Sequence, residues 1–188
     1  MKIIYCFFIL LSTGLYAQNT IDNYHFDVNK HILKMDSIKK TSIGKEFYDF
    51  KAMTLEGNSV IKRDLLGKIT IVDLWFVNCA PCISELGELN ELYKKFKDVF
   101  DFRFLSFTVD STDVAIKAVK KYNILYDVCP ISREVASNMN FGMGFPTKII
   151  INREGKIVFF KAGGSINPEN VEKDIKEIED IIRKLIYQ

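Results

Sequence analysis

Residues that build metal sites and disulfide scaffolds are scarce in this sequence. Its 188 residues include four cysteines and two histidines. One Cys-X-X-Cys pair is present, Cys79 and Cys82, whereas a zinc ribbon needs a second ligand pair. The histidines, His25 and His31, both lie in a polar segment near the N-terminus, where we expect solvated side chains. The composition therefore argues against a structural zinc site and against a fold held together by many disulfides.

The sequence also lacks a strong charge of either sign. The formal net charge is +2, with 27% charged and 48% hydrophobic residues, as in an ordinary globular protein. Such a balance gives no reason to expect nucleic acid or a membrane surface as a partner. The length suits one domain with a well-formed core, and no repeat or low-complexity tract indicates a second domain.

The hydrophobic run near the N-terminus is too short to span a membrane comfortably. Residues 3–11 form an apolar stretch after Lys2, and a cleavage point follows Ala17. This pattern predicts a secretory signal peptide over residues 1–17, then a lead-in segment over 18–43 and a domain over 44–188. An uncleaved anchor is the alternative, because Leu15 is a poor residue at the third position before the cut. We expect an oxidising compartment, most simply a bacterial periplasm.

The cysteine pair lies where a buried strand is predicted to turn into a helix. An apolar run over residues 69–77 leads into it, and an amphipathic segment over 83–100 leaves it. A helix N-terminus favours a thiolate, so the pKa of such a cysteine falls from about 8.5 to about 3.5–7.5. Cys79 would then be the exposed nucleophile, and Cys82 would resolve the mixed disulfide. A plain structural disulfide is the alternative, although such bonds normally close longer loops.

These residues resemble the thioredoxin superfamily, and more narrowly its TlpA/ResA-like branch of extracytoplasmic thiol-disulfide oxidoreductases. The resemblance covers about residues 44–164, and it rests on residues 71–75, Cys79-Ala80-Pro81-Cys82, Glu85 and Gly144-Phe145-Pro146-Thr147. It implies an α/β thioredoxin-like fold with a mixed central β-sheet flanked by helices. Residues 50–61 are predicted to add an N-terminal β-hairpin extension. The resemblance also implies a cis peptide bond before Pro146, in a loop that faces the cysteine pair.

Asp73 is the one charged residue in the apolar run, and a lone buried carboxylate is costly unless it is used or paired. By its resemblance to the thioredoxin superfamily, Asp73 matches the thioredoxin carboxylate that lies beneath the disulfide. We therefore predict that Asp73 is the general base for the Cys82 thiol, with a pKa raised by burial. An edge position or a side-chain partner is the alternative. The lysine that thioredoxins place on the following strand corresponds to Ser106, so we expect that partner to be absent.

The remaining site residues also follow from the resemblance. The predicted substrate-binding residues are Phe145, Pro146, Trp75, Ala80 and Pro81. Glu85 matches an acidic residue of the branch, and it is either a partner of the helix dipole or catalytic. The predicted partners are disulfide-bearing proteins and a membrane thiol electron donor. We expect a monomer that needs no organic cofactor or metal.

The residues between the cysteines favour the reductive direction, because Ala80-Pro81 lacks the histidine of strongly oxidising sites. Apo-cytochrome c is a candidate substrate from the ResA-like resemblance, although that branch has Glu where this chain has Ala80. A dithiol oxidant and a non-catalytic thioredoxin-like binding module remain alternatives. A copper-binding assembly protein would need a CxxxC motif and a later histidine, and a thiol peroxidase would need Thr in place of Phe76. Cys129 is predicted to be a small buried apolar residue, with a regulatory thiol as the alternative.

Overall fold

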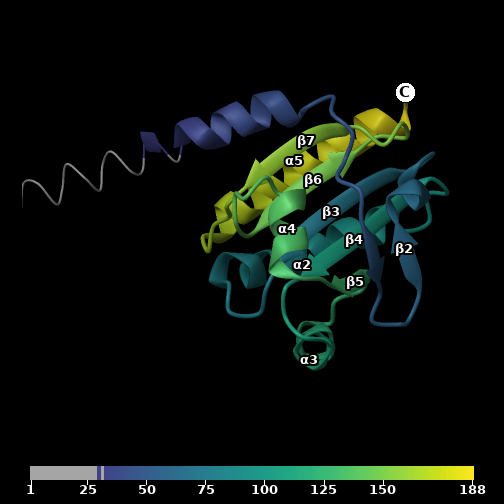
Figure 1. Cartoon of the computed structure of the whole chain (residues 1–188), viewed down its shortest axis with the longest axis vertical. Helices are drawn as coiled ribbons and strands as arrows, with labels where there is room; N and C mark the ends of the chain where they lie inside the picture. The colour runs from purple at the N-terminus through teal and green to yellow at the C-terminus, as the bar shows by residue number, and fades with distance from the viewer. Residues whose placement is uncertain (1–28, 31) are drawn as a thin grey trace, which may run out of the picture. The chain divides into compact units, whose positions relative to one another are not determined.

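The computed structural model describes residues 29, 30 and 32–188 (Figure 1). The predicted signal peptide over residues 1–17 and both histidines lie outside the described residues. The chain divides into two compact units, residues 1–38 and 39–188. In the first unit, the described residues 29, 30 and 32–38 are helical. Among the described residues, no helix combines the length and the apolar character needed to cross a membrane.

The second unit is built on a five-stranded mixed sheet. Its strands are β3 (Ile69–Trp75), β4 (Phe102–Thr108), β5 (Asp127–Pro130), β6 (Thr147–Ile151) and β7 (Ile157–Ala162). The strand order is β5-β4-β3-β6-β7, in which β3, β4 and β5 run parallel and β6 and β7 are antiparallel to their neighbours. β3 is buried along its whole length, as its nearly continuous apolar sequence predicts. The predicted mixed sheet is confirmed.

A separate two-stranded sheet forms the N-terminal hairpin. β1 (Lys51–Met53) and β2 (Ser59–Ile61) pair antiparallel, and the 3-10 helix η1 (Lys62–Leu65) follows them. The Leu55 N–H, just after β1, donates to the Val128 carbonyl of β5 at 2.9 Å, which ties the hairpin to the edge of the main sheet. The predicted hairpin extension is therefore confirmed.

Two long helices pack into the core on one face of the central sheet. α2 (Ala80–Phe96) follows β3, and α5 (Pro168–Ile186) is the last helix (Figure 1). Their buried side chains, such as Leu86 and Ile175, belong to one core cluster with Ile71 and Trp75 of β3. α2 begins at Ala80, earlier than residue 83 where the apolar pattern starts, because the first turn of the helix carries the cysteine motif instead.

The opposite face of the sheet is covered by residues that precede β1 and by residues near α4 (Arg133–Met139). Phe50 packs edge-on against Phe107 of β4, with ring centroids 5.3 Å apart. Phe141, two residues after α4, packs against Phe160 of β7 at 5.5 Å. The remaining helix, α3 (Thr112–Tyr122), connects β4 to β5. The described residues therefore form the α/β thioredoxin-like fold that the sequence predicts.

Candidate active site

The cysteine pair lies at the junction predicted for it, between β3 and α2. Cys79 is the N-cap residue of α2, and Cys82 lies in the first turn together with Pro81. The two cysteines form a disulfide, with their Cα atoms 5.2 Å apart. The Cys79 Sγ accepts a hydrogen bond from the Cys82 N–H at 3.3 Å. The helix N-terminus therefore faces this sulfur, where it would stabilise a negative charge.

Cys79, the nucleophile expected to be exposed, is less exposed in the disulfide form than the sequence suggests. Cys79 is 5% exposed and Cys82 is 2% exposed. In the oxidised state the Cys79 sulfur turns back toward the helix, since it is bonded to Cys82 and accepts the Cys82 N–H. The neighbouring Ala80 is exposed and Pro81 is half-buried.

The peptide bond between Phe145 and Pro146 is cis, as the resemblance implies. The Gly163 N–H donates to the Pro146 carbonyl at 2.8 Å, which holds this loop against the end of β7. The half-buried Phe145 ring packs edge-to-face on Phe76, with centroids 5.4 Å apart. Phe76 lies in the segment between β3 and Cys79, so this aromatic pair joins the cis-proline loop to the cysteine motif.

A row of polar residues crosses the sheet on the face that α2 and α5 cover. Ile71 and Trp75 of β3 belong to the core on that face, so Asp73, which lies between them, has the same orientation. Its cross-strand neighbours are Ser106 on β4 and Lys148 on β6. Since cross-strand neighbours share a face, the three side chains are placed to interact.

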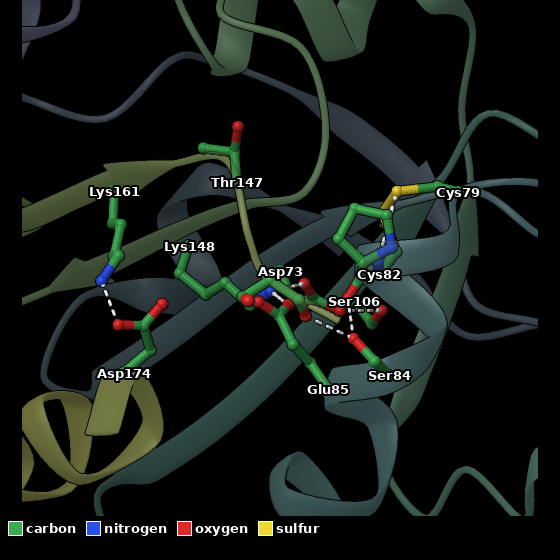
Figure 2. Close-up of polar contacts among 12 residues, drawn as sticks. Asp73, Cys79, Cys82, Ser84, Glu85, Ser106, Thr147, Lys148, Lys161 and Asp174 are labelled. Carbon is green, nitrogen blue, oxygen red and sulfur yellow. Dashed lines mark hydrogen bonds and ion pairs between the residues drawn. A yellow bond between two sulfur atoms is a disulfide. The ribbon is translucent and has the colours of Figure 1, made fainter. Parts of the chain in front are cut away.

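Lys148 bridges two buried carboxylates (Figure 2). Its Nζ lies 3.6 Å from Asp73 Oδ1 and forms an ion pair with Glu85 Oε2. The Ser106 hydroxyl donates to Asp73 Oδ2 at 3.2 Å. The side chains of Lys148, Asp73 and Glu85 are 4%, 1% and 2% exposed. We refer to Asp73, Lys148 and Glu85 as the buried ionic cluster.

The lysine that thioredoxins place on β4 is absent, as expected, but Asp73 still has a lysine partner. Position 106 on β4 is a serine, but the cation comes from β6, on the other side of β3. Reasoning from the sequence missed Lys148, although the sequence contains a signal for this residue. Lys148 is the one charge in β6, just as Asp73 is the one charge in β3. Two opposite charges, each the only one in a buried strand, are expected to form an ion pair, because burying either charge without a partner is costly.

Glu85 is part of the interior and not a partner of the helix dipole. α2 has no acidic residue in its first turn, and Glu85 lies in the turn that follows. It is three residues after Cys82, and both are 2% exposed, so they share the buried face of the helix. A Cβ atom built on Gly164 would lie 2.5 Å from Glu85 Oε1 and 2.7 Å from Pro146 Cγ. The loop after β7 therefore packs closely on both Glu85 and the cis-proline.

Burial governs protonation at this site. It raises the pKa of the Asp73 carboxyl above its ordinary value, against the opposing effects of Lys148 and of the Ser106 hydrogen bond. It also lowers the pKa of Lys148, a shift that Asp73 opposes. The pKa of Tyr126 is raised well above its ordinary value by burial and then by Asp73. The direction of the pKa shift of Asp73 agrees with the sequence prediction.

Two residues that the sequence singles out lie in the core. Trp75 is fully buried, so its side chain cannot contact a substrate directly, and its prediction as a substrate-binding residue is wrong. Cys129 on β5 is a free buried thiol, and burial raises its pKa to about 12, as expected for an apolar core residue. Within the part of the chain that the structure describes, no group of three or more His, Cys, Asp or Glu side chains could hold a metal ion.

The fold places this chain among the thioredoxin-like proteins. It resembles a thiol:disulfide interchange protein from a Bacteroides species with a TM-score of 0.62 and 25% identity, over 75% of this chain and 90% of that one. The thioredoxin domain of a thiol-disulfide oxidoreductase from Bacteroides vulgatus has a TM-score of 0.59 and 25% identity, over 72% of this chain and 96% of that one.

Comparison of sequences is more specific. The profile of the AhpC/TSA family matches residues 43–160, and the chain belongs to this family. It is 32% identical over 142 residues to the thiol-disulfide oxidoreductase ResA of Bacillus thuringiensis (strain Al Hakam), which is 74% of this chain and 80% of that protein. The chain is therefore a thiol-disulfide oxidoreductase of the ResA kind, with Cys79 and Cys82 as its CxxC pair.

Proposed function

We propose that this protein is an exported reductase of disulfides in other proteins. The observation that carries the proposal is the Cys79–Cys82 disulfide at the N-terminus of α2, with the buried Asp73 on the preceding strand. The Ala80-Pro81 dipeptide supports the reductive direction, because it lacks the histidine of strongly oxidising sites and is similar to the Gly-Pro of thioredoxin.

In the reduced enzyme, the Cys79 thiolate attacks a disulfide of the substrate. The bond between the two substrate sulfurs breaks, one sulfur leaves as a thiolate, and a mixed disulfide forms between Cys79 and the other. The Cys82 N–H supports the attacking thiolate, since it already donates to this sulfur in the oxidised state. The helix N-terminus therefore favours Cys79 as the nucleophile over the more buried Cys82.

Cys82 then resolves the mixed disulfide. Its thiol gives a proton to Asp73, the new thiolate attacks Cys79 Sγ, and the second substrate sulfur leaves as a thiolate. The substrate gains two electrons, and the cysteine pair returns to the disulfide. Burial supports Asp73 as the proton acceptor, because it raises the pKa of this carboxyl above that of an exposed aspartate. A membrane thiol donor would restore the two electrons.

We place the substrate against the cis-proline loop. The half-buried rings of Phe145 and Phe76 pack on each other there, and the Arg133 guanidinium lies 5.9 Å from the Phe76 ring centroid. Such a surface suits an extended segment with an apolar side chain near its cysteine. Pro146, Ala80 and Pro81 complete the surface. The cysteine pair of apo-cytochrome c is one candidate, because a haem-attachment motif must be reduced before it reacts.

We also propose that residues 1–17 are a signal peptide and that a lead-in segment over 18–43 precedes the domain over 44–188. The basic start and the short apolar stretch support export. N-terminal sequencing of the protein from a periplasmic fraction should begin at Gln18. Recovery from the cytosol with Met1 intact would contradict export, and membrane-bound protein with Met1 intact would favour an uncleaved anchor.

The first experiment is a redox titration followed by tryptophan fluorescence. Trp75 is the only tryptophan in the sequence, it is fully buried, and it lies four residues before Cys79. A two-electron transition near the roughly −270 mV of thioredoxin would support the reductase. A value near the roughly −120 mV of DsbA would reverse the direction of the mechanism. No transition over this range would favour a non-catalytic binding module.

The role of Asp73 can be tested separately. Asp73→Asn removes the proton acceptor and keeps the shape of the side chain, so it should slow dithiothreitol-driven insulin reduction at pH 7 by about 100-fold or more. Asp180→Asn is the matched control, because this exposed carboxylate on α5 is ion-paired with Lys176 and takes no part in the proposed steps. An unchanged rate for Asp73→Asn would remove Asp73 from the mechanism.

A further inference from the structure

Lys148 joins two carboxylates that reach it from different directions. Asp73 is its cross-strand neighbour on β3, whereas Glu85 comes from α2, three residues after Cys82. Figure 2 shows the three side chains converging, with the disulfide at the start of the helix that carries Glu85. The cluster thus links the strand before the CxxC motif, the helix after it and the strand that follows the cis-proline.

Other polar or titratable groups surround the buried ionic cluster. The other polar or titratable groups that face it are the Ser106 hydroxyl on β4, Lys161 opposite Lys148 on β7, the Tyr126 phenol before β5, and Asp174 and Glu177 on α5. Lys161 is itself ion-paired with the two acids of α5, at 2.5 and 3.8 Å. Among the described residues, Lys148 is therefore the one cation ion-paired with Asp73 and Glu85.

The charges leave the cluster one proton short of neutrality. Two carboxylates and one ammonium, all ionised, carry a net charge of −1. A net charge is costly at a site this buried, so the addition of one proton is favourable. Without Lys148, the two carboxylates would repel each other with no compensating cation, and Asp73 would hold a proton more tightly. Lys148 therefore determines whether Asp73 is ionised at neutral pH and can accept a proton.

We propose that Lys148 is a positioning residue for disulfide exchange, whose ammonium holds Asp73 and Glu85 together as a cluster that accepts the proton of Cys82. This inference rests on the proposed function, since Cys82 must lose a proton when it resolves a mixed disulfide. It extends that function by assigning the proton to a cluster of three residues and by making Lys148 the residue that keeps the acceptor ionised.

The resolving step moves one proton and one electron pair. The Cys82 S–H bond breaks, its proton passes to Asp73, and the cluster becomes neutral. The Cys82 sulfur bonds to Cys79 Sγ while the mixed disulfide breaks, so Cys82 is oxidised and the substrate sulfur leaves as a thiolate with the electron pair. A dithiol donor, dithiothreitol in the assay, later returns two electrons to the cysteine pair. Because the product cluster is neutral, the cost of burying charge favours the proton transfer.

The pH profile of turnover tests this role. Lys148→Met removes the ammonium but keeps most of the side-chain length, and it should lower insulin reduction at pH 7 by about tenfold or more. The rate should recover at higher pH, where the more tightly held proton is released. Lys148→Arg, which keeps the positive charge, should largely restore the wild-type profile. Lys176→Met removes a lysine from the exposed face of α5, where it is ion-paired with Asp180, and should leave the profile unchanged.

A second readout separates the two chemical steps. In a Cys82→Ser background the reaction stops at the mixed disulfide, so only the attack by Cys79 is measured. Lys148→Met in that background should attack at a rate close to that of Cys82→Ser alone. A wild-type pH profile for folded Lys148→Met, or an equal loss in the first attack, would overturn the proposal.

A paired substitution keeps the proposal testable if Lys148→Met fails to fold. Lys148→Met with Glu85→Gln removes one carboxylate together with the ammonium, so no pair of unpaired carboxylates remains. The rate of insulin reduction by this variant should still rise at a higher pH than that of the wild type, because Asp73 has lost its cation. A wild-type profile for this variant would refute the role of Lys148. Failure of the proposed function would instead show as a wild-type protein that does not reduce insulin at all.

Discussion

The loop after β7 offers a test of how tightly the site is packed. A Cβ atom on Gly164 would lie 2.5 Å from Glu85 Oε1 and 2.7 Å from Pro146 Cγ. Non-bonded heavy atoms make favourable contacts at about 3.5–4.0 Å. Gly164→Ala must therefore displace the loop, Glu85 or the proline. Gly164 does not adopt a left-handed φ, so the effect of the substitution is steric.

Neither neighbour of Gly164 can move freely. Glu85 is ion-paired with the buried Lys148, and the Pro146 carbonyl accepts a hydrogen bond from Gly163 at 2.8 Å. An extra methyl group in a well-packed region costs about 1–3 kcal/mol of unfolding free energy. A domain of this size loses about 2–4 °C of Tm for each kcal/mol, so the Tm should fall by about 2–12 °C. A displaced Glu85 would also weaken the ionic cluster, and disulfide exchange at pH 7 should slow.

Urea unfolding and insulin reduction measure the two effects side by side. Gly87→Ala is the matched control, because Gly87 is exposed in the middle of α2 and a Cβ there would meet nothing within 4 Å. That substitution should stabilise the protein by about 0.5–1 kcal/mol and leave exchange unchanged. A Gly164→Ala protein as stable as the wild type would refute the close packing. Lower stability with full activity would mean that the loop moves and Glu85 does not.

Two further predictions follow from burial and charge. Cys129 has a pKa of about 12 against an ordinary value of 9.0, so its thiolate fraction at neutral pH is roughly a thousandfold lower than that of a free cysteine. Iodoacetamide at pH 8 should label it in urea but not in the folded, oxidised protein, and rapid labelling of the folded state would contradict its burial. The pKa of Glu179 is lowered by hydrogen bonds from Lys95 and then Arg183, against the effect of burial. Its contribution to stability is present above the unfolded carboxyl pKa of about 4.3 and is lost as the pH falls through the lower folded value. Glu179→Gln should therefore be more destabilising at pH 7 than at pH 3 in urea unfolding, and equal losses at both pH values would exclude the ion pairs as the cause.

Much of the fold can be predicted because its signals are local. The apolar run of β3 indicates a strand buried on both faces, and Asn167 with Pro168 marks the start of α5. Asn167 does cap that helix, through hydrogen bonds from the Glu169 and Asn170 N–H groups at 2.9 and 3.4 Å. The cysteine motif and the cis-proline are also local, since each is a short run of neighbouring residues.

The buried ionic cluster depends on information that no short run of residues contains. Asp73 and Lys148 meet only because β3 and β6 pair antiparallel in one particular register. A slip of one residue would turn Lys148 to the other face of the sheet, away from Asp73 and α2. Glu85 joins them because its helix packs over the same face. Strand register and helix placement are set by the packing of the whole core, so this part of the site emerges only from the three-dimensional structure.

The residues of the buried ionic cluster suit a role in disulfide exchange better than a role in stability. Buried ion pairs are a weak source of stability, because the cost of removing charges from water can exceed their mutual attraction. Apolar residues at positions 73, 85 and 148 would complete the core at lower cost, and Ser106 would then have no acceptor. Here two carboxylates share one ammonium, which is the arrangement that leaves room for a single proton. It lies between the strand that leads to Cys79 and the helix that carries Cys82, where the resolving step of the proposed mechanism releases a proton.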